Sequence, residues 1–325
     1  MATAKPVKSA KPKAPRKPKL ATLPFAEKLV LNQWLLSLFG IDPLARHAHQ
    51  GKPVRAFHAL TQTLKDCREG LGPNNLHYFY ARLKEGWLPH ARLHPDSLLQ
   101  YEQNIVAHTA ALNATRERAI EWKYYQWLSL LFAEIYLDKY FNQRDALLTA
   151  LNVYVDRFNA HWASQSPPRA TGISPYTLEE LNKLCLQNAT GSGKTLLMHV
   201  NHRQFAHYAH EAGTHEAITR SLLITPNEGL SLQHEQEMRQ SGINVGRLVL
   251  DHNDLLKTDA GQLSRIDFVE ITKLGDKDGP TSIATRNLGD QNLIFCGRRP
   301  PRHGQSRRRR LVPAARKADG QGFCV

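Results

Sequence analysis

The residues best suited to chemistry form the octapeptide Asn188–Thr195, which reads NATGSGKT. Its two glycines, Gly191 and Gly193, permit backbone angles and a close approach that a side chain would block. The consecutive N–H groups of Thr190–Thr195 can converge on phosphate oxygens, and the start of a helix adds a favourable dipole. The octapeptide therefore predicts a phosphate-binding loop.

A lysine followed by a hydroxyl residue ends this loop, in the order that a nucleotide-binding P-loop requires. In such a loop Lys194 reaches the β- and γ-phosphates, and the Thr195 hydroxyl holds Mg²⁺. The predicted ligands are ATP and Mg²⁺, and the predicted cofactor-binding residues are Thr190, Gly191, Ser192, Gly193, Lys194 and Thr195. The usual pattern begins with glycine where this chain has Asn188, so a glycine-rich turn without a ligand is the alternative.

The elements around the octapeptide are those that a P-loop needs. An apolar strand is predicted over Leu184–Gln187, and a helix from Lys194 to about Ala212. Beyond it, short apolar segments alternate with helical stretches, which predicts βαβ units around a mostly parallel sheet. The further predicted strands are Ser221–Thr225, Arg247–Asp251, Phe268–Thr272 and Asn292–Phe295.

A second motif, Ser221–Leu230 (SLLITPNEGL), begins as a buried strand and continues into a loop interrupted by proline. The loop would lie at the same edge of the sheet as the octapeptide, where open α/β sheets place their ligands. From these residues alone, a ligand contact and a purely structural loop are equally open.

The first part of the chain, from Pro24 to about Trp162, has helical periodicity. Helices are predicted from Pro24 to Gly40, over Ser97–Thr115, over Glu121–Phe141 and from Arg144 to Phe158. In Glu121–Phe141 the aromatic residues recur among leucines at helical spacing, which favours core packing over base stacking. Ser164–Pro168 then predicts a linker, so a domain boundary is expected near 165–175.

The formal net charge of +14 comes from the two ends of the chain. Residues 1–20 contain seven Lys or Arg and no acid, and residues 297–325 have a net charge of +8. The sequence between them is nearly neutral, so the charge predicts two basic tails and no basic face on the folded part. Solvated tails and nonspecific nucleic-acid-binding arms are the two interpretations.

The four cysteines show no metal-ligand spacing, which fits a reducing cytoplasm. No apolar run reaches membrane-spanning length, and no signal peptide is indicated, so we expect a cytoplasmic protein that does not enter a membrane. Four histidines lie on the helix that follows the octapeptide: His199, His202, His207 and His210. No cysteine or carboxylate cluster completes a metal set with them, so we expect this helix to be structural.

The segments ATGSGKT and LLITPNEGLSLQH, at this separation, resemble superfamily 2 DEAD/DEAH-box helicases. The resemblance is closest to the branch that includes the Res subunits of type III restriction enzymes, and it covers roughly residues 25–295. Two further segments also resemble that branch, EWKYYQWLSLLFAEIYLDKYF and YTLEELNKL. The resemblance implies ATP hydrolysis coupled to movement on DNA, with a modification-methyltransferase subunit as a further partner. It also implies that Thr225, Pro226 and Asn227 contact the nucleic-acid backbone.

The expected fold class is α/β, with a helical N-terminal domain followed by an incomplete RecA-like P-loop NTPase domain built on a mostly parallel sheet. The expected divisions are a disordered basic tail at 1–20, the helical domain at 21–168, the ATP-binding domain at 169–295 and an Arg-rich tail at 296–325.

The resemblance stops after the strand Asn292–Phe295. In the resembled family an Asp-Glu pair and then a His follow this strand, whereas this chain continues with Cys296 and an Arg-rich stretch. Because those carboxylates would order Mg²⁺ and the attacking water, we predict ATP binding without turnover and assign no catalytic residue.

The degenerate codons of residues 296–303 can be read in the frame that starts at the second base of each codon. In that frame they allow the sequence Val-Asp-Glu-Gly-His-Arg-Gly, which contains an Asp-Glu pair followed by a His. We therefore hypothesise a one-base insertion near codon 295. The alternative is a genuine basic tail that binds nucleic acid. Two other classes also remain open, a P-loop ATPase or GTPase outside the helicases and a non-enzymatic protein that binds nucleic acid through its tails.

Overall fold

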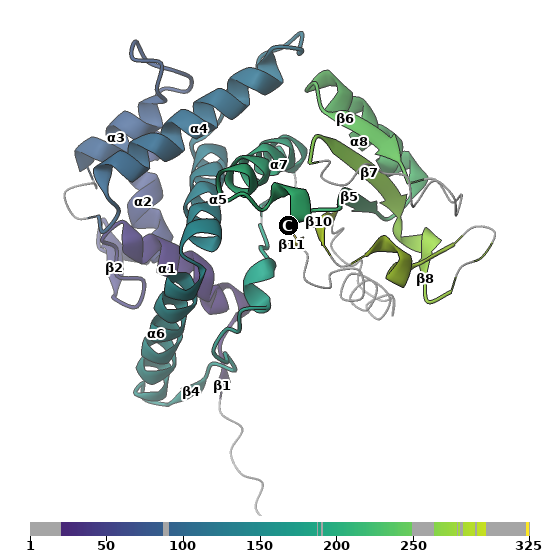
Figure 1. Ribbon diagram of the computed structural model, residues 1–325. Coiled ribbons are helices and arrows are strands. Elements are labelled where there is room, and N and C mark those ends of the chain that lie inside the picture. The colour runs from purple at the N-terminus through teal and green to yellow at the C-terminus, as the bar shows by residue number, and fades with distance from the viewer. Residues whose placement is uncertain are drawn as a thin grey trace, which may run out of the picture.

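The computed structural model describes residues 21–86, 91–186, 188–189, 191–248, 263–277, 279, 282–289, 291–296 and 323–324. A helical region is followed by a parallel sheet, so the predicted α/β fold class is confirmed (Figure 1). The helices are α1 (Val30–Leu38), α2 (Ala56–Lys65), α3 (Tyr78–Gly86), α4 (Pro95–Asn113), α5 (Tyr124–Asn142), α6 (Arg144–Ala163), α7 (Lys194–Glu211) and α8 (Glu228–Gln240). The predicted tail at 1–20 and nearly all of 296–325 lie outside the described residues.

Helix α5 is the centre of the helical region because most of its length is buried on every side. Its residues from Trp127 to Leu137 are buried, apart from the half-buried Ser129. Trp127 is completely enclosed, which confirms that the aromatic residues of this segment pack in the core. Leu131 and Ile135 belong to the same buried cluster as residues of α1, α4, α6 and α7. The helical region and helix α7, which follows the octapeptide, therefore share one core.

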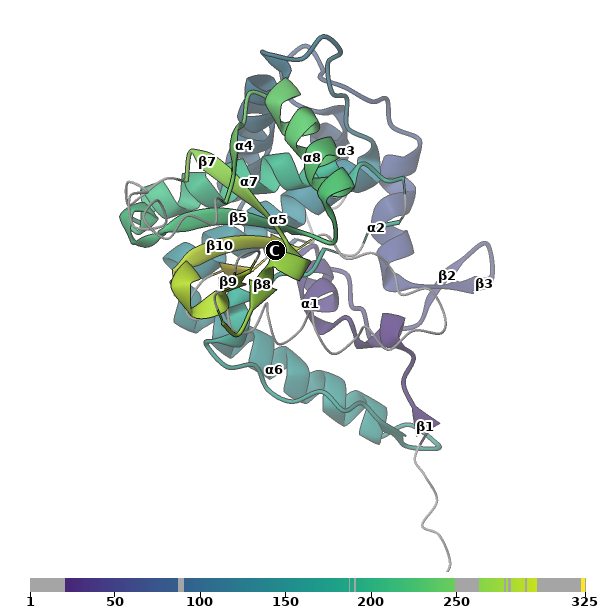
Figure 2. The same ribbon diagram turned by 90° about the vertical axis from the view of Figure 1, so that its right-hand side faces the viewer.

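Two helices and a short hairpin in the helical region were not predicted. They are α2, α3 and the antiparallel pair β2 (His47–His49) and β3 (Lys52–Val54). A second short pair, β1 (Ala21–Thr22) and β4 (Arg169–Ala170), is parallel and joins the start of the described chain to the segment after α6. In both views this pair lies at the end of α6 that is remote from the main sheet (Figures 1 and 2).

The main sheet has the order β11-β10-β5-β7-β6, and all of its pairs are parallel. Its strands are β5 (Arg220–Thr225), β6 (Asn244–Arg247), β7 (Arg265–Glu270), β10 (Asn292–Cys296) and β11 (Phe323–Cys324), and β8 (Leu274–Gly275) pairs separately with β9 (Ile283–Ala284). Every residue of β5 is buried, as expected for a strand covered on both faces. Leu223 packs into the main core, whereas Leu222 and Ile224 pack into a second cluster on the opposite face.

The predicted strand Leu184–Gln187 is wrong for its described residues, because Leu184–Leu186 belong to no strand. A strand needs a neighbouring backbone edge with free hydrogen-bonding groups. The outer edge of β10 is already paired with β11 at Leu293 and Ile294. The segment before the octapeptide therefore approaches α7 as irregular chain.

Two other strands were predicted too far along the chain. β6 is Asn244–Arg247, where Arg247–Asp251 was predicted, although residues 249–251 lie outside the described residues. β7 is Arg265–Glu270, where Phe268–Thr272 was predicted. The start of β7 is polar, and Arg265 Nε lies 2.8 Å from the buried Asp267 carboxylate in the same strand. Because of this ion pair, polar residues can occupy the start of the strand. A pattern of apolar residues therefore does not indicate where β7 begins.

Candidate functional site

The described residues Gly191–Gly193 of the octapeptide form a turn that leads directly into α7. Gly191 has a φ of 77° and Gly193 a φ of 78°, both in the left-handed region that glycine adopts without steric cost. Lys194 is the first residue of α7. Thr190 lies outside the described residues, so its predicted role has no structural description. Gly191, Ser192, Gly193, Lys194 and Thr195 are brought together at the start of one helix.

The start of α7 has the character of an anion site. The N–H groups of the first turn of a helix have no partner inside that helix. Gly193 precedes the helix and supplies no capping side chain, and the first turn contains no acidic residue. The helix is 18 residues long, so its dipole is fully developed at this end. Free N–H groups and a positive end together favour a negatively charged ligand.

The Lys194 side chain folds back over the loop. Its Nζ donates hydrogen bonds to the carbonyl of Ala189 at 2.8 Å and to the carbonyl of Asn188 at 3.3 Å. The side chain is exposed, and Thr195 beside it is half-buried. The ammonium group is therefore positioned over the turn by weak neutral acceptors, which a phosphate can replace with a stronger charge-assisted bond.

Two further features fit a phosphate. A Cβ placed on Gly191 would meet no atom of the described residues within 4 Å, so they leave this side of the turn open. The Ser192 side chain is buried, and its Oγ has no hydrogen-bond partner among the described residues. A buried hydroxyl without a partner is unfavourable unless a ligand or water satisfies it. Thr195 is the residue whose hydroxyl would hold Mg²⁺ with a bound nucleotide.

Helix α5 packs against one side of the turn, and the sequence analysis did not predict this contact. Gln126 Nε2 donates a hydrogen bond of 2.9 Å to the carbonyl of Ser192. One turn later, Ser129 Oγ lies 3.5 Å from the side-chain nitrogen of Asn188. Gln126 and Ser192 are 66 residues apart, and no local pattern indicates that they meet.

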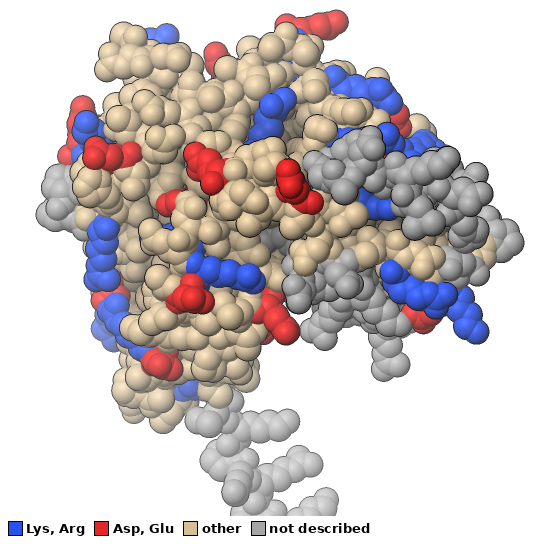
Figure 3. Space-filling model, in the orientation of Figure 1, with Lys and Arg blue, Asp and Glu red and all other residues tan. Residues whose placement is uncertain are grey.

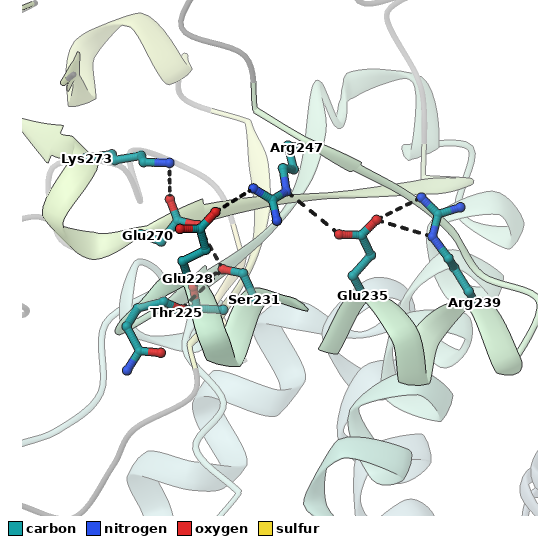
Figure 4. A network of polar contacts seen from close by, with 9 residues as sticks. Thr225, Glu228, Ser231, Glu235, Arg239, Arg247, Glu270 and Lys273 are labelled. Carbon is teal, nitrogen blue, oxygen red and sulfur yellow. Dashed lines mark hydrogen bonds and ion pairs between the residues drawn. The ribbon is translucent and has the colours of Figure 1, made fainter. Parts of the chain in front are cut away.

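The second motif lies at the carboxyl end of β5. Thr225, its last residue, is buried, and its Oγ1 shares a hydrogen bond of 2.6 Å with Ser231 Oγ (Figure 4). Ser231 also donates to Glu270, at the end of β7, at 3.1 Å. The Thr225 side chain is thus buried and bonded inside the protein, and its predicted contact with a nucleic acid stays a prediction.

The next two residues are closer to solvent. Pro226 is half-buried and Asn227 is exposed. Asn227 Oδ1 accepts a hydrogen bond of 3.0 Å from the N–H of Leu230 and so caps α8. Of the three predicted nucleic-acid-binding residues, Asn227 is the most accessible, and its side chain already has a structural partner.

Glu270 is the buried carboxylate at this edge of the sheet. Lys273 Nζ lies 2.6 Å from it. Burial alone would raise the pKa of Glu270, but the hydrogen bonds from Lys273 and Ser231 outweigh burial and hold the pKa below its ordinary value. The carboxylate therefore remains ionised and links α8 to β7.

The same network extends along α8 (Figure 4). Arg247, at the end of β6, lies 3.0 Å from Glu228 and 3.8 Å from Glu235. Glu235 also pairs with Arg239 at 2.9 Å. These ion pairs connect the exposed face of α8 to β6, the edge strand of the sheet.

The histidines of α7 divide between core and surface. His199 and His202 are buried, and burial lowers their pKa values to about 3 and about 4. Both rings are therefore neutral at pH 7, as expected for structural residues. Within the described ranges, no group of three or more His, Cys, Asp or Glu side chains could hold a metal ion.

Charge on the surface is mixed. On the face drawn in Figure 3, Lys and Arg side chains of the described residues are interspersed with Asp and Glu. β10 ends at the exposed Cys296, and residues 297–322, where the sequence departs from the resembled family, lie outside the described part of the chain. None of the helices that the structure describes is long and apolar enough to cross a membrane.

Comparison of the chain with protein-family models, with curated proteins and with solved structures finds no match.

Proposed function

We propose that this chain binds ATP and Mg²⁺ through the turn Gly191–Thr195, as the nucleotide-binding unit of a helicase-like motor. One observation supports this most strongly. Two glycines in the left-handed region lead without interruption into a long helix that begins Lys194-Thr195. This combination presents N–H groups, a helix dipole and an ammonium group to one point, which is what a phosphate chain requires.

Each residue then has a defined role. The N–H groups of Gly193, Lys194 and Thr195 bind phosphate oxygens, and Lys194 leaves the Ala189 and Asn188 carbonyls to neutralise phosphate charge. Thr195 holds Mg²⁺ through its hydroxyl. Bound ATP would supply the phosphoanhydride that such motors cleave. The proposal for this chain is binding without turnover, because Cys296, the last residue of β10, and the next residue Gly297 stand where the resembled family has Asp-Glu.

The nucleic-acid part of the proposal concerns the loop after β5. Asn227 is exposed at the carboxyl edge of the sheet, and the buried Thr225–Ser231–Glu270 bonds hold this loop in place. A rigid exposed loop can offer its backbone to DNA phosphates. DNA and a modification-methyltransferase subunit are the partners that the type III resemblance implies for such a motor. The cysteine usage fits a cytoplasmic location.

The test is a titration with fluorescent ATP and Mg²⁺. Wild type is expected to bind, and Lys194→Ala is expected to weaken binding by about tenfold or more, since a hydrogen bond to a charged group contributes about 1.5–3 kcal/mol. Lys65→Ala, which alters an exposed lysine on α2, is the matched control. Equal affinity of wild type and Lys194→Ala would contradict the proposal. Competition by GTP, and the effect of DNA on affinity, separate a helicase-type site from other P-loop proteins.

A further inference from the structure

The side-chain amide of Gln126 is held at both of its ends. Gln126 is the third residue of α5, and its Oε1 accepts a hydrogen bond of 2.9 Å from the N–H of Lys123. Its Nε2 donates to the carbonyl of Ser192, also at 2.9 Å. Because the oxygen and the nitrogen of the amide have different partners, the orientation of the amide is determined.

The helix that carries Gln126 is itself held in place by other contacts. Lys123 Nζ lies 2.7 Å from Glu69, and α5 is buried along most of its length. Gln204, on α7, donates to the carbonyl of Leu130 on α5 at 3.1 Å. The Gln126 side chain therefore projects from a helix that is held against α7, and the distance between Gln126 and the loop is maintained by the core.

The two glycines of the turn differ in what surrounds them. A Cβ on Gly193 would lie 2.5 Å from Gln126 Nε2, whereas a Cβ on Gly191 would have no neighbour within 4 Å in the described part of the chain. A separation of 2.5 Å is far shorter than any normal carbon–nitrogen contact. Gly193 thus leaves room for the Gln126 amide, and Gly191 leaves room on the open side of the turn.

The geometry of the peptide unit connects Gln126 to the ligand. The Ser192 carbonyl and the Gly193 N–H belong to one planar peptide unit, and in a trans peptide these two groups point in opposite directions. A carbonyl held toward α5 therefore directs the Gly193 N–H away from α5. Glycine allows such a peptide unit to rotate readily, so an external partner is needed to keep it in one orientation.

We propose that Gln126 is a positioning residue for nucleotide binding, which orients the Gly193 N–H toward the phosphates by holding the Ser192 carbonyl. This proposal rests on the proposed function. It assigns the helical region a part in the nucleotide site, since α5 supplies a contact that the loop lacks on its own. It also accounts for the close packing of α5 on the turn.

The test compares ligands that differ in phosphate content. Wild type, Gln126→Ala and the exposed control Gln62→Ala are titrated with ADP, pyrophosphate and adenosine, each with Mg²⁺. We expect Gln126→Ala to weaken ADP and pyrophosphate binding by about tenfold, the equivalent of one hydrogen bond. Adenosine binding and the thermal midpoint without ligand are expected to change little. Loss of affinity for all three ligands together would indicate a merely structural role and overturn the proposal.

A second measurement does not depend on a variant. In wild type labelled with ¹⁵N-glycine, the Gly193 amide signal is expected to move downfield when ADP or pyrophosphate is bound. An unchanged Gly193 signal with ADP bound overturns the role of Gln126. Failure of wild type to bind any phosphate ligand contradicts the proposed function itself, so the two failures are distinguishable. Gln126→Met, which keeps the length of the side chain without the donor, replaces Gln126→Ala if the latter does not fold.

Discussion

Tyr208, on helix α7, donates a hydrogen bond of 2.6 Å to the carboxyl group of Glu134 on α5. Asn104, on α4, donates to the same oxygen at 3.1 Å, while the other carboxyl oxygen has no hydrogen-bond partner among the described residues. His108 lies 4.0 Å from that second oxygen, and burial lowers the pKa of His108 to about 4, so its ring is neutral at pH 7. Glu134 thus lies where three helices meet, and its partners Tyr208, Asn104 and His108 are uncharged at pH 7.

Burial raises the pKa of Glu134 from 4.5 to about 7, although the hydrogen bonds from Tyr208 and Asn104 oppose the rise. The folded state therefore binds a proton that the unfolded state releases between about pH 4.5 and pH 7. The contribution of Glu134 protonation to the free energy of unfolding is complete below pH 4.5 and is lost as pH rises through 7. Glu134→Gln, which does not titrate, is expected to become more stable relative to wild type as pH increases from 5 to 8.

Urea midpoints of wild type and Glu134→Gln at pH 5, 6, 7 and 8 measure this difference. Glu117→Gln, at an exposed position, is the control and is expected to show no such trend. A difference between wild type and Glu134→Gln that is constant over this range would show that Glu134 ionises normally.

The buried histidines make the folded state less stable as pH falls, whereas the contribution of Glu134 is lost as pH rises. His199 and His202 have folded-state pKa values of about 3 and about 4, below the ordinary 6.5, because burial disfavours their charged forms. Their contribution to stability is complete above pH 6.5 and is lost as pH falls from 6.5 toward 4. His202→Gln is expected to reduce the acid sensitivity of the unfolding midpoint in this window. The exposed His210→Gln is expected to leave it unchanged, and equal slopes for the two variants would refute the assignment.

Alanine at the two glycines of the turn is expected to have unequal effects. Both substitutions place a side chain at a left-handed φ, which costs about 1–2 kcal/mol. Gly193→Ala also forces its Cβ against Gln126, whereas Gly191→Ala faces open space. Gly193→Ala should therefore lower the thermal midpoint more than Gly191→Ala does. Adding Gln126→Ala to Gly193→Ala should recover part of the loss, and no recovery would mean that the clash is not the cause.

The bridging hydroxyl of Ser231 offers a test of the network at the carboxyl edge of the sheet. Ser231 is buried, contacts the Thr225 hydroxyl and donates to Glu270. Ser231→Ala leaves two buried polar groups without this partner, so a loss of about 1–3 kcal/mol in the free energy of unfolding is expected. Ser174→Ala, at an exposed position, is the control, and chemical denaturation measures both. A loss no larger than that of the control would show that water replaces the hydroxyl.

The sequence by itself determined the local features of this protein. Glycines two apart before Lys194 predicted the turn and the start of α7, because left-handed φ angles and a helix start depend on neighbouring residues. The continuous apolar run in Leu222–Ile224 predicted a buried strand, as β5 is. The leucines and aromatic residues of α5 predicted a core helix in the same way.

The tertiary structure decided which of these pieces meet. Leu184–Leu186 has the composition of a strand but forms none, since the available edge of β10 pairs with β11. Thr225 was predicted to contact nucleic acid, but its hydroxyl is bonded to Ser231 inside the protein. Gln126 reaches a carbonyl 66 residues away. Pairing of strand edges and contacts between distant side chains depend on how whole elements pack, and that information is not contained in any local stretch of sequence.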